Sequence, residues 1–153
     1  MRAENRKRGG GDRALIRRAK ITDIDKIFDI LLKTDSPWSK EGIGGSIENG
    51  ICLLFDDGEI KGVLFLSLAA DECEILNFAV DEKSRRLGIG GKLLFEGLKT
   101  CRDMGAETAY LDVRESNFKA IALYEKSGFV RIGKRAKYYS APVEDALLYN
   151  KKL

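Results

Sequence analysis

The chain alternates between β-rich apolar runs and segments whose apolar residues recur at helical spacing. The β-rich runs predict strands over residues 15–19, 51–55, 60–68, 72–80, 108–113, 129–135 and 146–150. The helical spacing predicts helices over residues 24–32, from 38–39 onward, over 89–101 and from 117 to about 126. Because the first half predicts antiparallel hairpins and the middle predicts a β-α-β unit, the pattern indicates a mixed α/β domain of the α+β class.

The segment between the apolar run 75–80 and the helix predicted from Ile89 is rich in glycine and in basic residues. Its charged and flexible residues are Lys83, Arg85, Arg86, Gly88, Gly90, Gly91 and Lys92. Glycine lets a backbone approach a ligand closely. The first turn of a helix offers unpaired N–H groups and a partial positive charge. The sequence therefore predicts a phosphate-binding loop here.

Two common phosphate-binding motifs do not fit this loop. A Walker loop needs Ser or Thr after Gly-Lys, whereas Leu93 follows Gly91-Lys92, and Arg86 stands where its first glycine belongs. A dinucleotide fingerprint needs a third glycine after Gly88 and Gly90, and that position is also Leu93. A purely structural turn stays open as the alternative.

Composition narrows the class of protein. The chain has 153 residues, of which 44% are hydrophobic and 33% charged, as in a soluble globular domain. Because no apolar run has the length of a membrane span and the N-terminus has no apolar signal region, we predict a cytoplasmic protein. Residues 1–13 carry five basic and two acidic side chains, and the remainder carries 22 of each sign. The charge pattern predicts a flexible basic extension over 1–13, a domain over 14–153, and no specific nucleic-acid or membrane partner.

Cysteine and histidine usage excludes several chemistries. The three cysteines, Cys52, Cys73 and Cys101, are odd in number and widely spaced, so they predict buried reduced thiols rather than disulfides or a metal site. The chain has no histidine. Histidine-based triads and histidine metal sites are therefore excluded, and we predict no metal.

Two motifs resemble the GNAT family of N-acetyltransferases. The motif Arg85-x-x-Gly88-x-Gly90, after Asn77-Phe78-Ala79-Val80, resembles the acetyl-CoA loop of that family. The motif Asn117-x-x-Ala120-x-x-Leu123-Tyr124-x-x-x-Gly128-Phe129 resembles its second conserved segment. The resemblance covers nearly everything after Leu15. It implies a single-domain GNAT acyl-CoA N-acyltransferase fold, in which a central mixed twisted sheet is flanked by about four helices, and acetyl-CoA as co-substrate.

The same resemblance assigns residues to acetyl-CoA. The pyrophosphate is expected on the N–H groups of the loop, the pantetheine arm on the backbone of the preceding strand, and Asn117 on that arm. The residues implied are Phe78, Val80, Arg85, Arg86, Leu87, Gly88, Ile89, Gly90, Gly91 and Asn117. The structural alternatives are that Phe78 and Val80 belong to the strand core and that Asn117 only caps a helix.

A narrower resemblance concerns the substrate. The segments 111–117 and 120–125, Pro37-Trp38-Ser39 and Arg135-x-x-Tyr138-Tyr139 resemble the ribosomal-protein-alanine N-acetyltransferase branch. The implied partner is a protein N-terminus, with ribosomal proteins among the candidates, bound by a monomer or weak homodimer. Trp38 would form one wall of the peptide groove, and Tyr138 and Tyr139 would lie over it on the closing hairpin. The alternative for the tyrosines is packing within the hairpin.

Direct transfer from a thioester to an amine needs a base and an acid but no covalent intermediate. Tyr124 matches the family tyrosine that faces the thioester sulfur, so it is the expected acid. Asp112 stands where the branch carries a glutamate base, and it is either the base or a structural carboxylate paired with Arg114. Three hypotheses follow: acetylation of protein N-termini, acetylation of a small amine or antibiotic, and a non-catalytic CoA-binding module.

Overall fold

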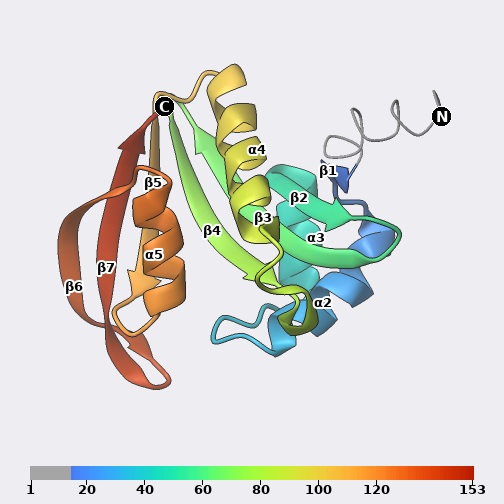
Figure 1. Cartoon of the computed structure of the whole chain (residues 1–153), viewed down its shortest axis with the longest axis horizontal. Helices are drawn as coiled ribbons and strands as arrows, with labels where there is room; N and C mark the ends of the chain where they lie inside the picture. Colours follow the sequence, from blue (N-terminus) through green and yellow to red (C-terminus); the bar gives the residue numbers. More distant parts are fainter. Residues whose placement is uncertain (1–14) are drawn as a thin grey trace. The chain divides into compact units, whose positions relative to one another are not determined.

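The computed structural model describes residues 15–153, and the extension predicted over 1–13 lies outside the described residues. The elements are β1 (Ile16–Arg18), η1 (Ile21–Asp23), α2 (Ile24–Leu32), α3 (Lys40–Asn49), β2 (Ile51–Asp56), β3 (Ile60–Ala69), β4 (Glu72–Val80), η2 (Glu82–Ser84), α4 (Ile89–Asp103), β5 (Thr108–Arg114), α5 (Phe118–Lys126), β6 (Val130–Ser140) and β7 (Val143–Lys152) (Figure 1). The order of strands and helices is the one that the apolar pattern predicts.

The strands form one hydrogen-bonded series in the order β1-β2-β3-β4-β5-β7-β6. β4 and β5 are parallel, whereas the pairs β1–β2, β2–β3, β5–β7 and β6–β7 are antiparallel. The mixed sheet expected from the sequence is therefore confirmed. Contacts divide the described chain into two compact units, the first containing residues up to 66 and 77–97, and the second containing 67–76 and 98–153.

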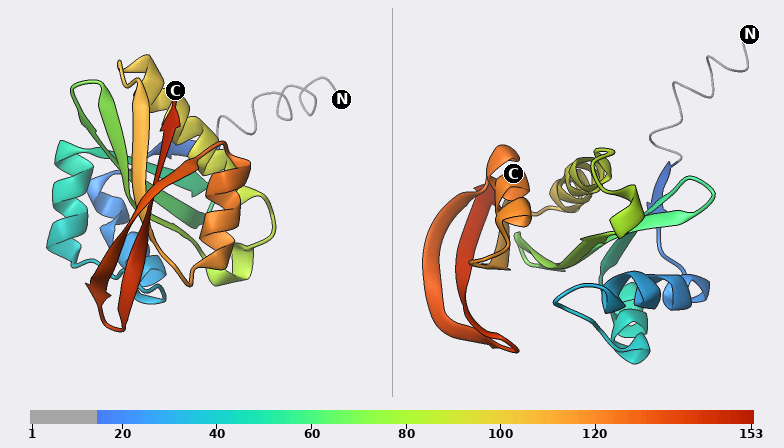
Figure 2. Two further views of the ribbon diagram at one scale, coloured as in Figure 1. Left: turned by 90° about the vertical axis from the view of Figure 1, so that its left-hand side faces the viewer. Right: turned by 60° about the horizontal axis from the view of Figure 1, so that its bottom comes forward.

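In the first unit, alternate residues of β3 face different helices. Val63 and Phe65 lie in a core cluster with residues of α2 and α3, including Ile27 and Ile43. Leu64, one position along, points the other way, toward Gly97 of α4. Helices α2 and α3 therefore cover one face of β3 and α4 covers the other (Figure 2), as the period of two along a strand requires.

Glycine allows α4 to lie close to β3. A Cβ on Gly62 would stand 2.8 Å from Leu93 Cδ1, and a Cβ on Gly97 would meet the Leu64 side chain. Both glycines are thus required by close packing of the helix on the strand. The first turns of α4, which carry the predicted loop residues, are consequently held against β3.

The second unit is built on β7, which pairs with β5 on one side and β6 on the other. On one face, Leu111 of β5 lies opposite Tyr149 of β7, and both are buried. The Tyr149 hydroxyl donates to Glu125 Oε2 of α5 at 3.1 Å, so α5 is tied to this face. Asp112 and Arg114, at alternate positions, belong to the opposite face of β5.

The three cysteines form no disulfide in the described part of the chain, and all three are buried, as the sequence predicts. Burial raises the pKa of Cys52 to about 12. The pKa of Cys73 is raised by a hydrogen bond with Cys101 and by burial. Among residues 15–153, no helix is long and apolar enough to cross a membrane, and no group of three or more metal-ligating side chains forms a metal site.

An ion pair at the edge of the first unit gives a pH-dependent prediction. Arg17 donates from Nη1 and Nη2 to the two carboxylate oxygens of Asp23 at 2.8 and 2.9 Å. The Arg17 hydrogen bonds hold the pKa of Asp23 below its ordinary value. We expect Asp23→Asn to lower the free energy of unfolding by about 1–2 kcal/mol at pH 7.

Because the pKa of Asp23 is lower in the folded than in the unfolded state, its contribution is present above the unfolded pKa of about 3.9 and lost as the pH falls through the folded pKa. Urea unfolding at pH 7 and at pH 3 measures it, and the difference from wild type should shrink at pH 3. Asp25→Asn is the control, since within residues 15–153 the ion pair of Asp25 is an exposed one with Lys40. An equal loss in both variants would contradict the assignment.

Candidate active site

The residues that the sequence predicts for the site fall into two groups, one in each unit. The first unit holds the loop and the groups around it: Trp38, Phe78, Val80 and Arg85 to Gly91. The second unit holds the groups predicted for catalysis and for the hairpin: Asp112, Asn117, Tyr124, Tyr138 and Tyr139.

The loop between β4 and α4 is anchored at its start and turned sharply in its middle. The Asp81 N–H donates to the Lys61 carbonyl at 2.7 Å, which fixes the end of β4 to β3. Arg86 and Gly88 have φ values of 68° and 76°, in the left-handed region. Glycine adopts this conformation without strain, whereas arginine does so at a cost in free energy.

The turn leads into the first N–H groups of α4. The Lys92 N–H donates to the Gly88 carbonyl at 3.2 Å, which is the first hydrogen bond of the helix. The N–H groups of Ile89 to Gly91 come before it and therefore have no acceptor within the helix. A Cβ built on Gly88 or on Gly91 would have no neighbouring atom within 4 Å.

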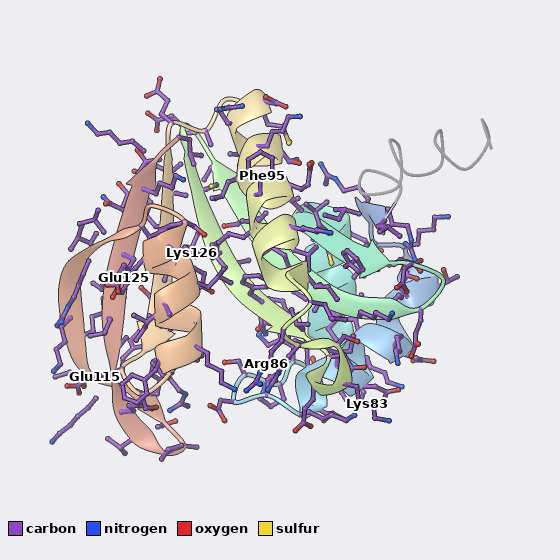
Figure 3. The ribbon with its side chains drawn as sticks, viewed as in Figure 1. Lys83, Arg86, Phe95, Glu115, Glu125 and Lys126 are labelled. Atoms are coloured by element: carbon purple, nitrogen blue, oxygen red, sulfur yellow. The ribbon has the colours of Figure 1, made fainter. Side chains whose placement is uncertain are left out.

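The loop that leads to these N–H groups carries three exposed cations. Lys83, Arg85 and Arg86 all have exposed side chains, and Figure 3 labels Lys83 and Arg86 on the loop before α4. Arg85 Nε donates to the Val80 carbonyl at 3.4 Å. Positive side chains, free N–H groups and open space suit a pyrophosphate.

Asn77 is a residue to which sequence reasoning gave no role. It is 8% exposed, and its Oδ1 accepts the Phe78 N–H at 2.9 Å. Its Nδ2 donates to the Ser36 carbonyl at 2.9 Å, so it ties β4 to the segment that leads to Trp38. The Trp38 ring packs on Phe65 at 4.7 Å between centroids, and the residue is half-buried. No motif signals this role, because Ser36 lies 41 residues from Asn77 in the chain.

In the second unit, Tyr124 is a buried phenol on a capped helix. Asn117 Oδ1 accepts the Ala120 N–H at 3.2 Å, which begins α5. Tyr124 is 6% exposed, and its ring meets Phe129 edge-on at 5.7 Å. Burial raises the pKa of Tyr124 above its ordinary value, and the nearby Tyr139 raises it further. The phenol is therefore protonated at neutral pH, the form in which it can act as a donor.

Asp112 is half-buried on β5, and its carboxylate interacts electrostatically with Tyr139. Burial is the main cause that raises the pKa of Tyr139 to about 12, and Asp112 is the next. The alternative that Asp112 is paired with Arg114 is wrong, because Arg114 forms its ion pair with Glu144 at 3.2 Å. Local sequence could not indicate that partner, which is 30 residues away.

Tyr138 and Tyr139 lie on the hairpin of β6 and β7, as the sequence predicts. Their rings meet edge-on with centroids 5.1 Å apart. The Arg114 guanidinium lies over the Tyr139 ring at 4.3 Å, whereas Tyr138 is 48% exposed. Tyr139 is thus packed against Arg114, whereas the Tyr138 ring is half exposed. The role of both tyrosines over a peptide groove stays a prediction.

Residues 24–129 match the Acetyltransferase (GNAT) family. The chain belongs to this family. It is therefore an N-acetyltransferase, and its strand order and helices are those of a GNAT domain.

Several GNAT proteins are similar over almost the whole chain. The [ribosomal protein bS18]-alanine N-acetyltransferase of Salmonella typhimurium is 35% identical over 132 residues, which cover 83% of this chain and 89% of that protein. The crystal structure of the Escherichia coli ribosomal-protein-S18-alanine N-acetyltransferase gives a TM-score of 0.82 at 29% identity, covering 90% and 92% of the two chains. A GNAT acetyltransferase from Elizabethkingia anophelis with acetyl-CoA bound gives 0.71 at 27% identity, covering 82% and 90%.

Proposed function

We propose that this GNAT enzyme transfers the acetyl group of acetyl-CoA to the N-terminal α-amino group of a protein, with ribosomal proteins among the candidate substrates. The observation that carries the proposal is the 35% identity to a bS18-alanine N-acetyltransferase over most of both chains. The exposed Tyr138 ring, on a hairpin next to the buried phenol of Tyr124, supports a peptide substrate over a small amine.

The loop before α4 supports acetyl-CoA as the donor. We assign the pyrophosphate to the N–H groups of Leu87 to Gly91, with Arg85 and Arg86 supplying charge. The open space at Gly88 and Gly91 fits this assignment. The Phe78 N–H already has Asn77 as its acceptor, so a pantetheine contact there would share or replace that hydrogen bond.

The residues of the second unit supply the proton transfers that direct acyl transfer needs. The amine nitrogen bonds to the acyl carbon, and the bond from that carbon to sulfur breaks. Asp112 accepts the proton that the amine loses, directly or through a water. Tyr124 donates to the departing thiolate, for which its raised pKa keeps the phenol protonated. An α-amine has a pKa of about 8, against about 10.4 for lysine, so a weaker base is sufficient to deprotonate it.

Peptide acetylation with acetyl-CoA tests the proposal. Peptides with a free N-terminus, the same peptides with a blocked N-terminus, and blocked peptides containing lysine are compared by mass spectrometry. We expect acetylation of free N-termini alone. Equal activity on internal lysine, or a polyamine or aminoglycoside that outcompetes every peptide, would overturn the proposal. Binding of CoA without turnover would indicate a non-catalytic module.

The loop conformation gives a prediction for acetyl-CoA. Gly88→Ala places a Cβ on a residue with φ of 76°, and the left-handed region costs an L-residue about 1–2 kcal/mol. We expect the KM for acetyl-CoA to rise by about tenfold because the loop shifts away from this conformation. Initial rates at saturating peptide measure it. Gly105→Ala is the matched control, since Gly105 has φ of 105° with open space around it but lies outside the loop. A similar rise in the control would contradict the assignment.

A further inference from the structure

The end of β5 is fastened to the turn between β6 and β7 by one arginine. Arg114 Nη1 donates to the Pro142 carbonyl at 3.1 Å and to Glu144 Oε1 at 3.2 Å. Arg114 Nη2 donates to the Ala141 carbonyl at 3.3 Å. A guanidinium has the planar fork that reaches several acceptors at once, and a lysine ammonium does not.

Glu144 extends this connection to the segment before α5. Its second oxygen, Oε2, accepts the Ser116 N–H at 2.6 Å. Hydrogen bonding with Ser116, from its side chain first and also from this N–H, holds the pKa of Glu144 below its ordinary value, and Arg114 adds to the effect. Glu144 is therefore ionised at neutral pH. Arg114 and Glu144 together, named here the hairpin clamp, join β5, the start of α5 and the start of β7.

The hairpin clamp contacts Tyr139 directly. The Arg114 guanidinium lies 4.3 Å from the centre of the Tyr139 ring, and Tyr139 is the register partner of Glu144. The β6–β7 register shifts between Arg135 and Tyr139, and within this bulge Lys137 has φ of 52°. Because the regular ladder is interrupted just before Tyr139, the clamp supplies the fixed contacts that orient its ring.

The clamp is costly as a purely structural device. Arg114 is 8% exposed, and its Nε is buried with no hydrogen-bond partner among the described residues. Leaving a buried donor unpaired costs free energy that an apolar side chain would avoid. A role in positioning Tyr139 explains why a buried guanidinium occupies position 114.

We propose that Arg114 and Glu144 are positioning residues, which hold Tyr139 in the orientation that binds the peptide substrate. This inference rests on the proposed function and on the sequence prediction that Tyr139 lies over the peptide groove. The clamp shares no residue with the loop 85–91. We therefore expect its main effect on recognition of the peptide rather than of the acetyl-CoA pyrophosphate.

Steady-state kinetics of Arg114→Lys and Glu144→Gln test the proposal. We expect the KM for the peptide to rise at least about tenfold, the equivalent of about 1.4 kcal/mol. The kcat at saturating peptide and the KM for acetyl-CoA should stay within about threefold of wild type. Lys134→Met is the matched control on the same hairpin, since Lys134 is exposed and its ion pairs with Glu115 and Asp145 do not involve Arg114 or Glu144. An unchanged KM for the peptide, or an equal rise in both KM values, would overturn the proposal.

Amide hydrogen exchange tests the structural role of the hairpin clamp independently of the proposed function. In Arg114→Lys the amides of residues 136–146 should exchange faster than in wild type, whereas Lys134→Met should leave them unchanged. Unchanged exchange in Arg114→Lys would show that the clamp does not hold the hairpin. If wild-type protein acetylates no peptide N-terminus, the proposed function fails, and this measurement still decides whether Arg114 orders Tyr139.

Discussion

Replacing Tyr124 by phenylalanine is expected to lower kcat by about 10²-fold or more, the range of a positioned general acid. The change removes only the hydroxyl, so the buried ring keeps its edge-on contact with Phe129. Because a donor to the departing thiolate acts in the transition state, the KM for acetyl-CoA should change little. Initial-rate kinetics with both substrates varied separate the two parameters.

Tyr149→Phe is the matched control for Tyr124→Phe. Tyr149 is also buried, and its hydroxyl donates to Glu125 Oε2 at 3.1 Å. Its loss should lower the free energy of unfolding by about 1 kcal/mol and leave kcat near wild type. If Tyr124→Phe retains full kcat, or if both variants lose kcat equally, Tyr124 is not the acid.

The dependence of kcat on pH provides a second test of the role of Tyr124. Burial raises its pKa above the ordinary value for tyrosine, which is about 10. A group with a raised pKa keeps its proton to higher pH, so deprotonation of Tyr124 should cause no fall in kcat below about pH 10. A fall near pH 8 or 9 that is absent from Tyr124→Phe would contradict this assignment.

Local signals in the sequence predicted the helix starts well, because caps and turns depend on neighbouring residues. Asn117 caps α5 in the structure as the motif indicates. The segment after Trp38 is rich in glycine and so has a low helix propensity, yet α3 is regular over ten residues. Ser39 Oγ accepts the Gly42 N–H at 3.0 Å, and Ile43 is fully buried in the core. Tertiary burial thus outweighs the low helix propensity of glycine.

Contacts between distant segments could not be predicted from the sequence. β6 was predicted to end at residue 135, but it continues to Ser140 through a bulge in which the Lys137 N–H donates to Asp145 Oδ1 at 2.8 Å. The partner of Arg114 was missed for the same reason, because the register of β6 on β7 determines which carboxylate reaches it. The polar residues of the site could be recognised in the sequence by their type and spacing. Their hydrogen-bond and ion-pair partners could be identified only from the folded structure.

Replacing Phe65 by alanine is expected to have the largest effect on stability in the first unit. Phe65 is fully buried between α2 and α3 on one side of β3, and it supports the Trp38 ring at 4.7 Å. A Phe→Ala change in such a core costs about 3–5 kcal/mol, since it removes apolar contacts and leaves a cavity. For a chain of this length the melting temperature should fall by roughly 8–15 °C.

Urea unfolding followed by fluorescence measures this change, because Trp38 is the only tryptophan of the chain and lies at the altered position. Phe95→Ala is the matched control, since the Phe95 side chain on α4 is 68% exposed, and it should change the free energy of unfolding by no more than about 0.5 kcal/mol. Equal losses in the two variants would mean that the face of β3 with Phe65 is not the core. A loss confined to Phe65→Ala, with altered Trp38 emission in the folded state, would show that the same packing that stabilises the unit also fixes Trp38.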